Sequence, residues 1–378
     1  MTSGAGPSAD AAVAFGIDIG GTKVLGVALG PLDAIVAEAR VPTPAAPAHA
    51  DHQGAAGDTG VEVAYAIADV VAQLDEAVQG SQGSQGSQGS QGSQGSLGSQ
   101  GSPGSPGSPG SPGSGADNEA PAVGVGAPGM LDREGQLRFA PNLPQAHGVN
   151  WRVLIGDRLP GRRIVVENDA NLAALAEHRL GAARGYQHVV MVTLGTGIGG
   201  GLIVDGRVQV GGHGFAGEIG HMVVDPAGPP CPCGRRGCWE RFASGGGLGL
   251  MAREAALAGR LPGVVALAGG DPEGVRGEDV TAAALAGDPD AQRVIEQVGW
   301  WVGFGLANLA CVLDPECFVL GGGLVGAGAL LLDSARRAFD ELVEGGATRP
   351  ATAIVTAAFG ERSGAVGAAL AARDGGLG

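Results

Sequence analysis

The sequence is poor in aromatic and basic residues, and it contains no long hydrophobic run. Phe, Trp and Tyr make up 4% of the 378 residues, and the excess of Asp and Glu over Lys and Arg gives a formal net charge of −15. Because negative charge repels nucleic acid and anionic membranes, neither is expected as a partner. No uninterrupted apolar stretch approaches the roughly 20 residues that a membrane-spanning helix needs. The opening residues, MTSGAGPSAD, lack the basic and apolar segments of a signal peptide, so a cytoplasmic location is expected.

Cysteine is scarce too, but three of the five cysteines cluster after a histidine. The four residues are His221, Cys231, Cys233 and Cys238. One His and three Cys suffice for a closed tetrahedral zinc site, and the Gly and Pro residues between them permit the tight turns that such a site needs. The spacing therefore predicts a structural Zn²⁺ ion in loop 221–238, with one disulfide and a spare thiol as the alternative. Cys311 and Cys317 lie in apolar surroundings and are expected in the core.

Two carboxylates stand next to the predicted zinc loop. Glu218 lies three residues before His221, and Glu240 lies two residues after Cys238. A bound metal would hold both carboxylates and the free edge of the imidazole ring in fixed positions. Carboxylate oxygens accept hydrogen bonds from hydroxyl groups, so we expect the site beside the metal to bind a polyol.

A strand, a glycine-rich turn and a second strand occur twice, roughly 175 residues apart. Apolar residues alternate on both sides of the turn within 13–30 and again within 188–206. The turns contain Gly20, Gly21, Thr22 and Lys23 in the first copy, and Gly195, Thr196 and Gly197 in the second. Glycine lets the backbone approach an anion closely, and successive N–H groups of such turns bind phosphate. The repetition predicts two related domains whose turns face each other across a cleft, an arrangement that suits a nucleoside triphosphate.

Asp169 is the residue best placed to act as a base. It follows a short buried strand, 164–167, and begins a helix, with Asn168 and Asn171 beside it. Paired glycine turns, an Asp at a strand end and a polar pocket tied to a metal all fit ATP-dependent phosphoryl transfer to a hydroxyl, which needs a base. An N-cap role for Asp169 is the alternative, although the polar cluster is larger than capping requires.

A glycine run also ends a later strand. It consists of Gly321, Gly322 and Gly323. Without side chains, this backbone would let an adenine ring lie flat against it.

Six motifs together make the sequence recognisable. They are Asp18-Ile-Gly-Gly-Thr-Lys23, Gly126-Ala-Pro-Gly129, Glu167-Asn-Asp-Ala-Asn171, Leu194-Gly-Thr-Gly-Ile-Gly-Gly200, Gly217-Glu-Ile-Gly-His221 and Cys231-Pro-Cys-Gly-Arg-Arg-Gly-Cys238. On these motifs the sequence resembles the ROK family of sugar kinases and repressors, and within it the ATP-dependent glucokinases. The resemblance spans nearly everything from Val13 to Ala372 outside a Gly/Ser repeat and a Pro-rich loop. It implies an α/β, two-domain, actin-like (hexokinase-type) ATPase fold whose inter-domain cleft closes over sugar and ATP.

The expected organisation follows from the repetition and the resemblance. We expect a disordered tail at 1–12, a small α/β domain at 13–182, a large α/β domain at 183–361, and a C-terminal helix at 362–378 that packs back on the small domain. Within the small domain, 79–115 is an insertion in which the triplet x-Gly-Ser occurs twelve times. Glycine at every third position also occurs in collagen, but Pro occupies only four triplets, which favours a solvated flexible tether.

The resemblance also implies roles for individual residues. ATP–Mg²⁺ would phosphorylate the 6-hydroxyl of glucose, Asp169 would take the hydroxyl proton, and Asp18 would help to hold Mg²⁺. The implied sugar contacts are Asn142, Asn168, Asp169, Glu218, His221 and Glu240. The implied nucleotide contacts are Asp18, Gly20, Gly21, Thr22, Lys23, Gly195, Thr196, Gly197, Gly321, Gly322 and Gly323. His221 would bind zinc through one ring nitrogen and sugar through the other, and for Lys23 a solvated turn position is the alternative.

Several functional alternatives stay open at this point. Residues that contact hydroxyls do not distinguish hexoses by themselves, so kinases for fructose, N-acetylmannosamine or N-acetylglucosamine are alternatives. Polyphosphate is an alternative donor, although the sequence shows no basic track for it. Sugar-sensing repressors of the family carry a helix-turn-helix before the kinase-like part, and only about a dozen polar residues precede the first strand here. Because family members are commonly dimers or tetramers, a homodimer or homotetramer is expected.

Overall fold

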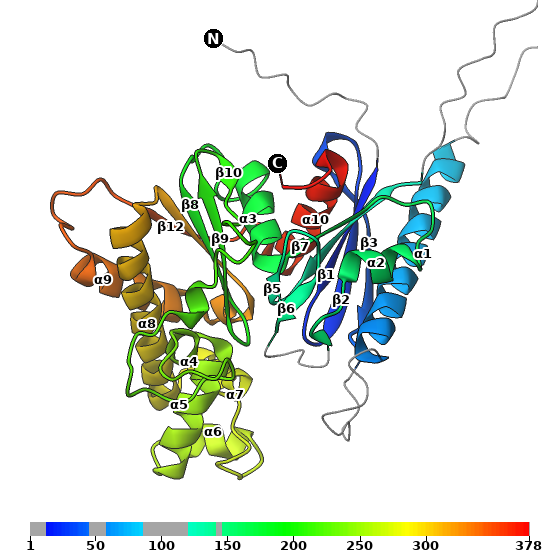
Figure 1. Cartoon of the computed structure of the whole chain (residues 1–378). Helices are drawn as coiled ribbons and strands as arrows, with labels where there is room; N and C mark the ends of the chain where they lie inside the picture. The colour runs from blue at the N-terminus through cyan, green and yellow to red at the C-terminus, as the bar shows by residue number, and fades with distance from the viewer. Residues whose placement is uncertain (1–12, 45–57, 86–119, 141–145, 378) are drawn as a thin grey trace, which may run out of the picture.

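The computed structural model describes residues 13–44, 58–85, 120–140 and 146–377 (Figure 1). Three expectations fall outside these residues: the tail at 1–12, the repeat from residue 86 onward, and the sugar contact Asn142. Within the described residues, no helix combines the length and the hydropathy of a membrane span.

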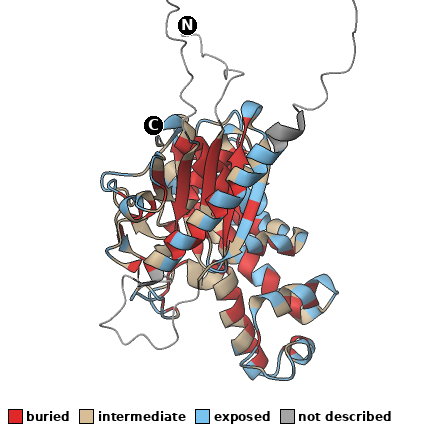
Figure 2. Ribbon diagram, turned by 90° about the vertical axis from the view of Figure 1, so that its right-hand side faces the viewer, coloured by how far each residue is buried: buried red, intermediate tan, exposed pale blue. Residues whose placement is uncertain are grey.

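The first sheet has five strands in the order β3-β2-β1-β4-β7. Their bounds are β1 Ala14–Ile19, β2 Lys23–Leu29, β3 Ile35–Pro42, β4 Ala122–Ala127 and β7 Ile164–Asn168. Strands β1, β2 and β3 pair antiparallel, whereas β1, β4 and β7 run parallel. The sheet is therefore a meander extended by two crossover strands, and the carboxyl ends of β1, β4 and β7 meet at one edge. The inner strands β1, β2 and β4 are largely buried (Figure 2), whereas the edge strand β3 has one buried residue.

The second sheet repeats this topology in the order β10-β9-β8-β11-β12. Its strands are β8 Val189–Leu194, β9 Ile198–Val204, β10 Arg207–Val208, β11 Cys317–Gly321 and β12 Ala353–Thr356. Strands β8, β9 and β10 are antiparallel, and β8, β11 and β12 are parallel. Asp205 and Gly206, with φ of 50° and 72°, form the two-residue turn between β9 and β10, as the hairpin rule predicts. The duplication expected from the sequence is confirmed, since each glycine turn joins the first two strands of its sheet.

Ten α-helices lie in the described part of the chain. They are α1 Asp58–Gln85, α2 Trp151–Gly156, α3 Asp169–Arg179, α4 Glu240–Ala243, α5 Gly245–Leu257, α6 Pro262–Leu267, α7 Gly277–Leu285, α8 Pro289–Leu313, α9 Ala329–Leu342 and α10 Ser363–Asp374. Helices α3 and α10 pack together between the two sheets: α3 covers β8 and β9, and α10 covers β1 and β4 (Figure 1). A Cβ at Gly16 or Gly124 would lie 1.9 Å from a carbonyl oxygen of α10. The helix therefore sits directly on the backbone of the first sheet.

Some local expectations were wrong. Residues 79–85, which were expected to belong to the flexible tether, continue helix α1 to Gln85, into the first triplets of the repeat. Each glycine disfavours a helix by about 1 kcal/mol relative to Ala, so the composition of these triplets predicted coil. The helix nevertheless extends into them, because the preceding part of α1 is well packed. Cys317 is buried as expected, but Cys311 is exposed. Cys311 lies five residues after the buried Leu306, which places it about 140° away around helix α8 and off the core face.

Glu177 joins the two places where the chain crosses from one sheet to the other. Its side chain is fully buried on α3, with 0% exposure. It accepts hydrogen bonds from Ala182 N (2.9 Å) on the first crossing. On the second crossing it accepts them from Ala358 N (2.9 Å), Phe359 N (3.0 Å) and Ser363 Oγ (2.8 Å). A single carboxylate thus ties both crossings to α3 and to the start of α10.

Candidate active site

The first glycine turn lies between β1 and β2, beside Asp18. Gly20 N donates to Lys23 O at 2.9 Å, which closes the turn, and Gly21 and Thr22 are exposed at its tip. Burial, then the charge of Asp169, raises the pKa of Asp18 to about 8, while Lys23 opposes the rise. The two carboxylates therefore repel each other inside the fold, an arrangement that a divalent cation would relieve.

Gly126 provides the space between these two carboxylates. It lies near the end of β4, the strand between β1 and β7. A Cβ at Gly126 would lie 3.3 Å from Asp18 Oδ1 and 3.4 Å from Asp169 Cα. The Gly-Ala-Pro-Gly motif is thus located where the carboxyl ends of three parallel strands meet, the usual place of an active site in sheets of this kind.

Hydrogen bonds from the segment at the start of α5 hold the second glycine turn in place. Gly245 N donates to Gly195 O (2.8 Å), and Gly246 N (3.1 Å) and Ser244 Oγ (3.0 Å) both donate to Thr196 O. These bonds fix the backbone of the turn while Thr196 itself stays exposed.

The late glycine run lies against the same end of strand β8. A Cβ at Gly322, which has a φ of 85°, would lie 2.5 Å from Leu194 O. Gly321 is buried in β11, and Gly322 and Gly323 are exposed. The expected adenine surface is therefore next to the second glycine turn.

Asn168, and not Asp169, is the N-cap of α3. Asn168 Oδ1 accepts from Ala170 N (3.0 Å) and Asn171 N (3.1 Å), and its Nδ2 donates to Gly129 O (3.2 Å). Asp169 Oδ1 accepts one bond from Ala170 N at 2.8 Å. Burial raises the pKa of Asp169 to about 6, with the backbone N–H of Ala170 opposing the rise. A carboxylate with this pKa is ionised at neutral pH and is a stronger base than an exposed Asp.

The four residues of the expected zinc site are close together. The ligand atoms of His221, Cys231, Cys233 and Cys238 all lie within 4.8 Å of one another. His221 Nδ1 is 3.7 Å from Cys231 Sγ, and Cys233 Sγ is 3.6 Å from Cys238 Sγ. Zn–S bonds of about 2.3 Å put two sulfurs of a tetrahedral site roughly 3.8 Å apart. The donor set and its spacing therefore fit Zn²⁺.

Two carboxylates, those of Glu218 and Glu240, lie next to this cluster. Burial, then Asp169 and then Glu240, raises the pKa of Glu218 to about 7. Glu240 Oε1 accepts from Cys231 Sγ at 3.0 Å, and a Cβ at Gly197 would lie 2.5 Å from Glu240 Oε2. Glu240 thus connects the cysteine cluster to the second glycine turn. Because His221 directs Nδ1 toward Cys231 Sγ, Nε2 is the ring nitrogen that stays available for a second partner.

The side chain of Lys23, an expected nucleotide contact, already has a partner. Its Nζ forms an ion pair with Glu361, a residue that lies in a short 3-10 helix, Gly360–Arg362, before α10. Sequence reasoning missed Glu361, because no motif surrounds it and 338 residues separate it from Lys23.

A cavity of about 180 Å³ adjoins Asn168 on the side of the hairpin β5 Met130–Leu131 and β6 Leu137–Phe139. Arg133, Glu167 and Asn171 contribute to its wall. The sequence did not predict this cavity either, because strands of two and three residues are too short to show an alternation of apolar and polar residues.

Comparison with known proteins gives the family. Residues 114–374 match the model of the ROK family. The chain belongs to the ROK family. Its fold is the actin-like, hexokinase-type fold of ROK kinases.

Two glucokinase relatives match nearly the whole chain, and a repressor matches part of it. The glucokinase of Streptomyces coelicolor is 34% identical over 368 residues, which are 95% of this chain and 97% of the relative. The crystal structure of a ROK glucokinase from Streptomyces griseus, in complex with glucose and AMPPNP, superposes with a TM-score of 0.75 at 33% identity, covering 96% of this chain and 100% of that one. The xylose repressor of Bacillus subtilis is 29% identical, over 57% of this chain and 51% of the repressor.

Proposed function

We propose that this ROK protein is a glucokinase, which transfers the γ-phosphoryl group of ATP to the 6-hydroxyl of glucose. The observation that carries the proposal is the position of Asp169, a carboxylate with a pKa of about 6 that lies next to Asp18 across Gly126. Two glycine turns at equivalent positions of two similar sheets supply backbone N–H groups for the phosphates. A ROK glucokinase with 33% identity has been crystallised with glucose and an ATP analogue.

The reaction is a direct displacement at phosphorus. Asp169 accepts the proton of the 6-hydroxyl as the hydroxyl oxygen attacks the γ-phosphorus, and the bond from that phosphorus to the β,γ-bridging oxygen breaks to release ADP. The Mg²⁺ that accompanies ATP neutralises charge that develops on the phosphate oxygens. Asp18 faces this charge from the end of β1, and the turns at 20–23 and 195–197 orient the triphosphate.

The other hydroxyls of the sugar would be held by Glu218, His221 Nε2 and Glu240, with Asn168 at the start of α3. Carboxylates that accept from hydroxyls, beside an imidazole, match the alternating donors and acceptors of a hexose. Zinc, when bound by His221 Nδ1 and the three thiolates, fixes the tautomer of the ring. In this proposal the two domains are residues 13–182 and 183–361.

An assay of ADP release tests the proposal. Glucose, fructose, N-acetylmannosamine and N-acetylglucosamine are each supplied with ATP, and glucose also with polyphosphate. We expect the highest kcat/KM with glucose and ATP. A higher value with another hexose would assign the enzyme to that sugar, and no turnover with any acceptor would defeat the proposal.

Cys233→Ser is expected to abolish stoichiometric zinc binding and to raise the KM for glucose about tenfold. The serine hydroxyl is a poor zinc ligand, and the loss of metal releases His221 and the adjacent carboxylates from their positions. Metal analysis of the purified protein and glucose kinetics measure the two effects. Cys311→Ser is the matched control, because Cys311 is exposed and is not one of the four clustered residues. Retained zinc, or an unchanged KM without zinc, would contradict the assignment.

A further inference from the structure

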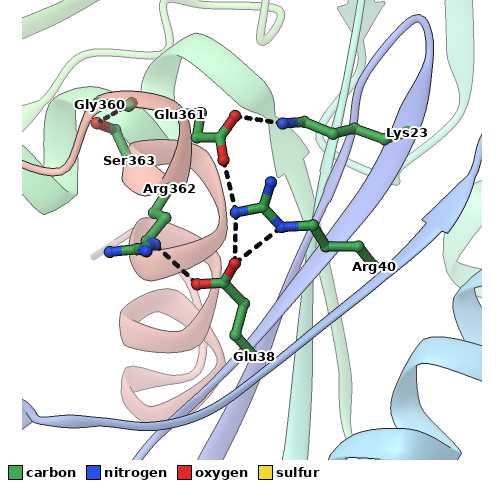
Figure 3. Close-up of polar contacts among 7 residues, drawn as sticks. All are labelled: Lys23, Glu38, Arg40, Gly360, Glu361, Arg362 and Ser363. Atoms are coloured by element: carbon green, nitrogen blue, oxygen red, sulfur yellow. Dashed lines mark hydrogen bonds and ion pairs between the residues drawn. The ribbon is translucent and has the colours of Figure 1, made fainter.

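Five charged side chains form a continuous ionic network beside the first glycine turn (Figure 3). Lys23 pairs with Glu361. Arg40 contacts Glu361 at 2.6 Å and Glu38 at 2.5 Å, and Arg362 contacts Glu38 at 2.7 Å. Arg40 therefore bridges the two carboxylates, and Glu361 is shared between a lysine and an arginine.

The network links the glycine turn to the second crossing between the sheets. Lys23 is the first residue of β2, and Glu38 and Arg40 lie on β3. Glu361 and Arg362 belong to the short 3-10 helix that leads into α10. Figure 3 shows the two acidic side chains between the strands and this helix.

The network lies at the proposed phosphate end of the site. The charge of Lys23 lowers the pKa of Asp18 against the effect of burial, so the ammonium group is within electrostatic range of the proposed magnesium site. A Cβ at Gly364, three residues after Glu361, would lie 2.7 Å from Asp18 Oδ1. The start of α10, which directly follows Glu361 and Arg362, thus packs against Asp18. Lys23 and Arg40 lower the pKa of Glu361, which keeps it ionised.

We propose that Glu361 holds the Lys23 ammonium group in the nucleotide-free enzyme, and that the phosphates of ATP displace Glu361 from Lys23. This inference rests on the proposed function, since it assigns a phosphate to Lys23. Glu361 is then a residue that sets nucleotide affinity: it competes with the phosphates for Lys23 and repels them by its own charge.

The energies of the two contacts favour this exchange. The side chains of Lys23 and Glu361 are 36% and 49% exposed, and ion pairs so exposed contribute little to stability. A phosphate oxygen offers Lys23 a charge-assisted hydrogen bond to a group with a higher negative charge. Glu361 does not become unpaired when Lys23 leaves, because Arg40 stays in contact with it.

Nucleotide binding and kinetics of matched variants test the exchange. The variants are Glu361→Gln, Glu38→Gln, Lys23→Met and the double variant Lys23→Met/Glu361→Gln. Titration calorimetry with Mg²⁺–AMPPNP and Mg²⁺–ADP gives the Kd without turnover, and steady-state assays give the KM for ATP and for glucose.

We expect Glu361→Gln to lower the Kd and the KM for nucleotide about three- to tenfold, the effect of removing one nearby like charge and one competitor. The KM for glucose should not change. Glu38→Gln breaks contacts to Arg40 and Arg362 but none to Lys23, so its nucleotide affinity should equal that of the wild type. Lys23→Met should weaken nucleotide binding, and in that background Glu361→Gln should have less than half of its effect.

Two outcomes would overturn the inference: nucleotide affinity that is unchanged or weaker in Glu361→Gln, or an equal gain in Glu38→Gln. The proposed function is judged separately. If the wild type binds nucleotide but phosphorylates no sugar, the proposed function fails while the binding series still decides the role of Glu361.

Discussion

Asp169→Asn is expected to lower kcat at least a hundredfold while glucose binding stays near that of the wild type. A general base contributes about 10²–10⁴ to the rate, and the amide cannot accept the proton. The amide oxygen can still accept the hydrogen bond from Ala170 N, so the start of α3 should keep its shape. Steady-state kinetics give kcat, and calorimetry gives the Kd for glucose. Asp205→Asn is the control, because Asp205 lies in an exposed turn.

The pH profile separates loss of the base from loss of structure. Burial raises the pKa of Asp169 from 3.8 to about 6, and the carboxylate must be ionised to accept a proton. Because kcat/KM reports the ionisations of the free enzyme, the wild-type kcat/KM should fall about tenfold for each pH unit below 6 through this group. In Asp169→Asn this acidic limb should be absent. A variant that keeps more than a tenth of the wild-type kcat would remove Asp169 from the role.

Glu177→Leu is expected to lower the free energy of unfolding by about 3–5 kcal/mol. The substitution leaves three backbone N–H groups without their acceptor, while the Ser363 hydroxyl keeps Gly360 O as an acceptor at 2.9 Å. Each buried unsatisfied donor costs about 1–3 kcal/mol. Urea denaturation measures the change. Glu341→Leu is the control on α9, where the carboxylate is exposed, and it should stay within about 0.5 kcal/mol of the wild type. If both variants lost the same free energy of unfolding, the carboxylate of Glu177 would have no special role in stability.

A smaller substitution at the same position refines the test. Glu177→Gln keeps one acceptor oxygen but turns an amide NH₂ toward backbone N–H groups, so it should lose less stability than Glu177→Leu. A Cβ at Gly181 would lie 2.1 Å from Glu177 Oε2. Gly181→Ala is thus expected to displace the Glu177 carboxylate and to weaken the same hydrogen bonds.

The strands and the metal cluster were predictable because their signals are local. Alternation of apolar residues defines β1 and β2 within sixteen residues, 14–29. The four candidate zinc ligands fall within 221–238, and a short loop needs no distant contact to bring them together. The recurrence of the strand–turn–strand pattern was enough to predict the duplicated topology.

The remaining features depend on contacts between distant segments. Glu361 lies 338 residues from Lys23 in the sequence, and Ala358 and Ser363 lie 181 and 186 residues from Glu177, so only the tertiary fold brings these groups together. Nothing in the neighbourhood of Glu361 distinguishes it from an ordinary solvated carboxylate. The capping role of Asn168 was also unforeseen, because Asn168 and Asp169 are equally suited to that position by residue type.

The position of α10 bears on how the protein forms during translation. One hydrophobic cluster combines Leu25 and Val27 of β2, Val165 of β7 and residues 365–372 of α10. The ribosome delivers β2 long before α10 emerges, so this face of the first sheet stays uncovered for most of synthesis. A nascent chain that stops short of α10 should therefore be a chaperone client and a target of proteases, whereas the full-length chain escapes both once α10 docks.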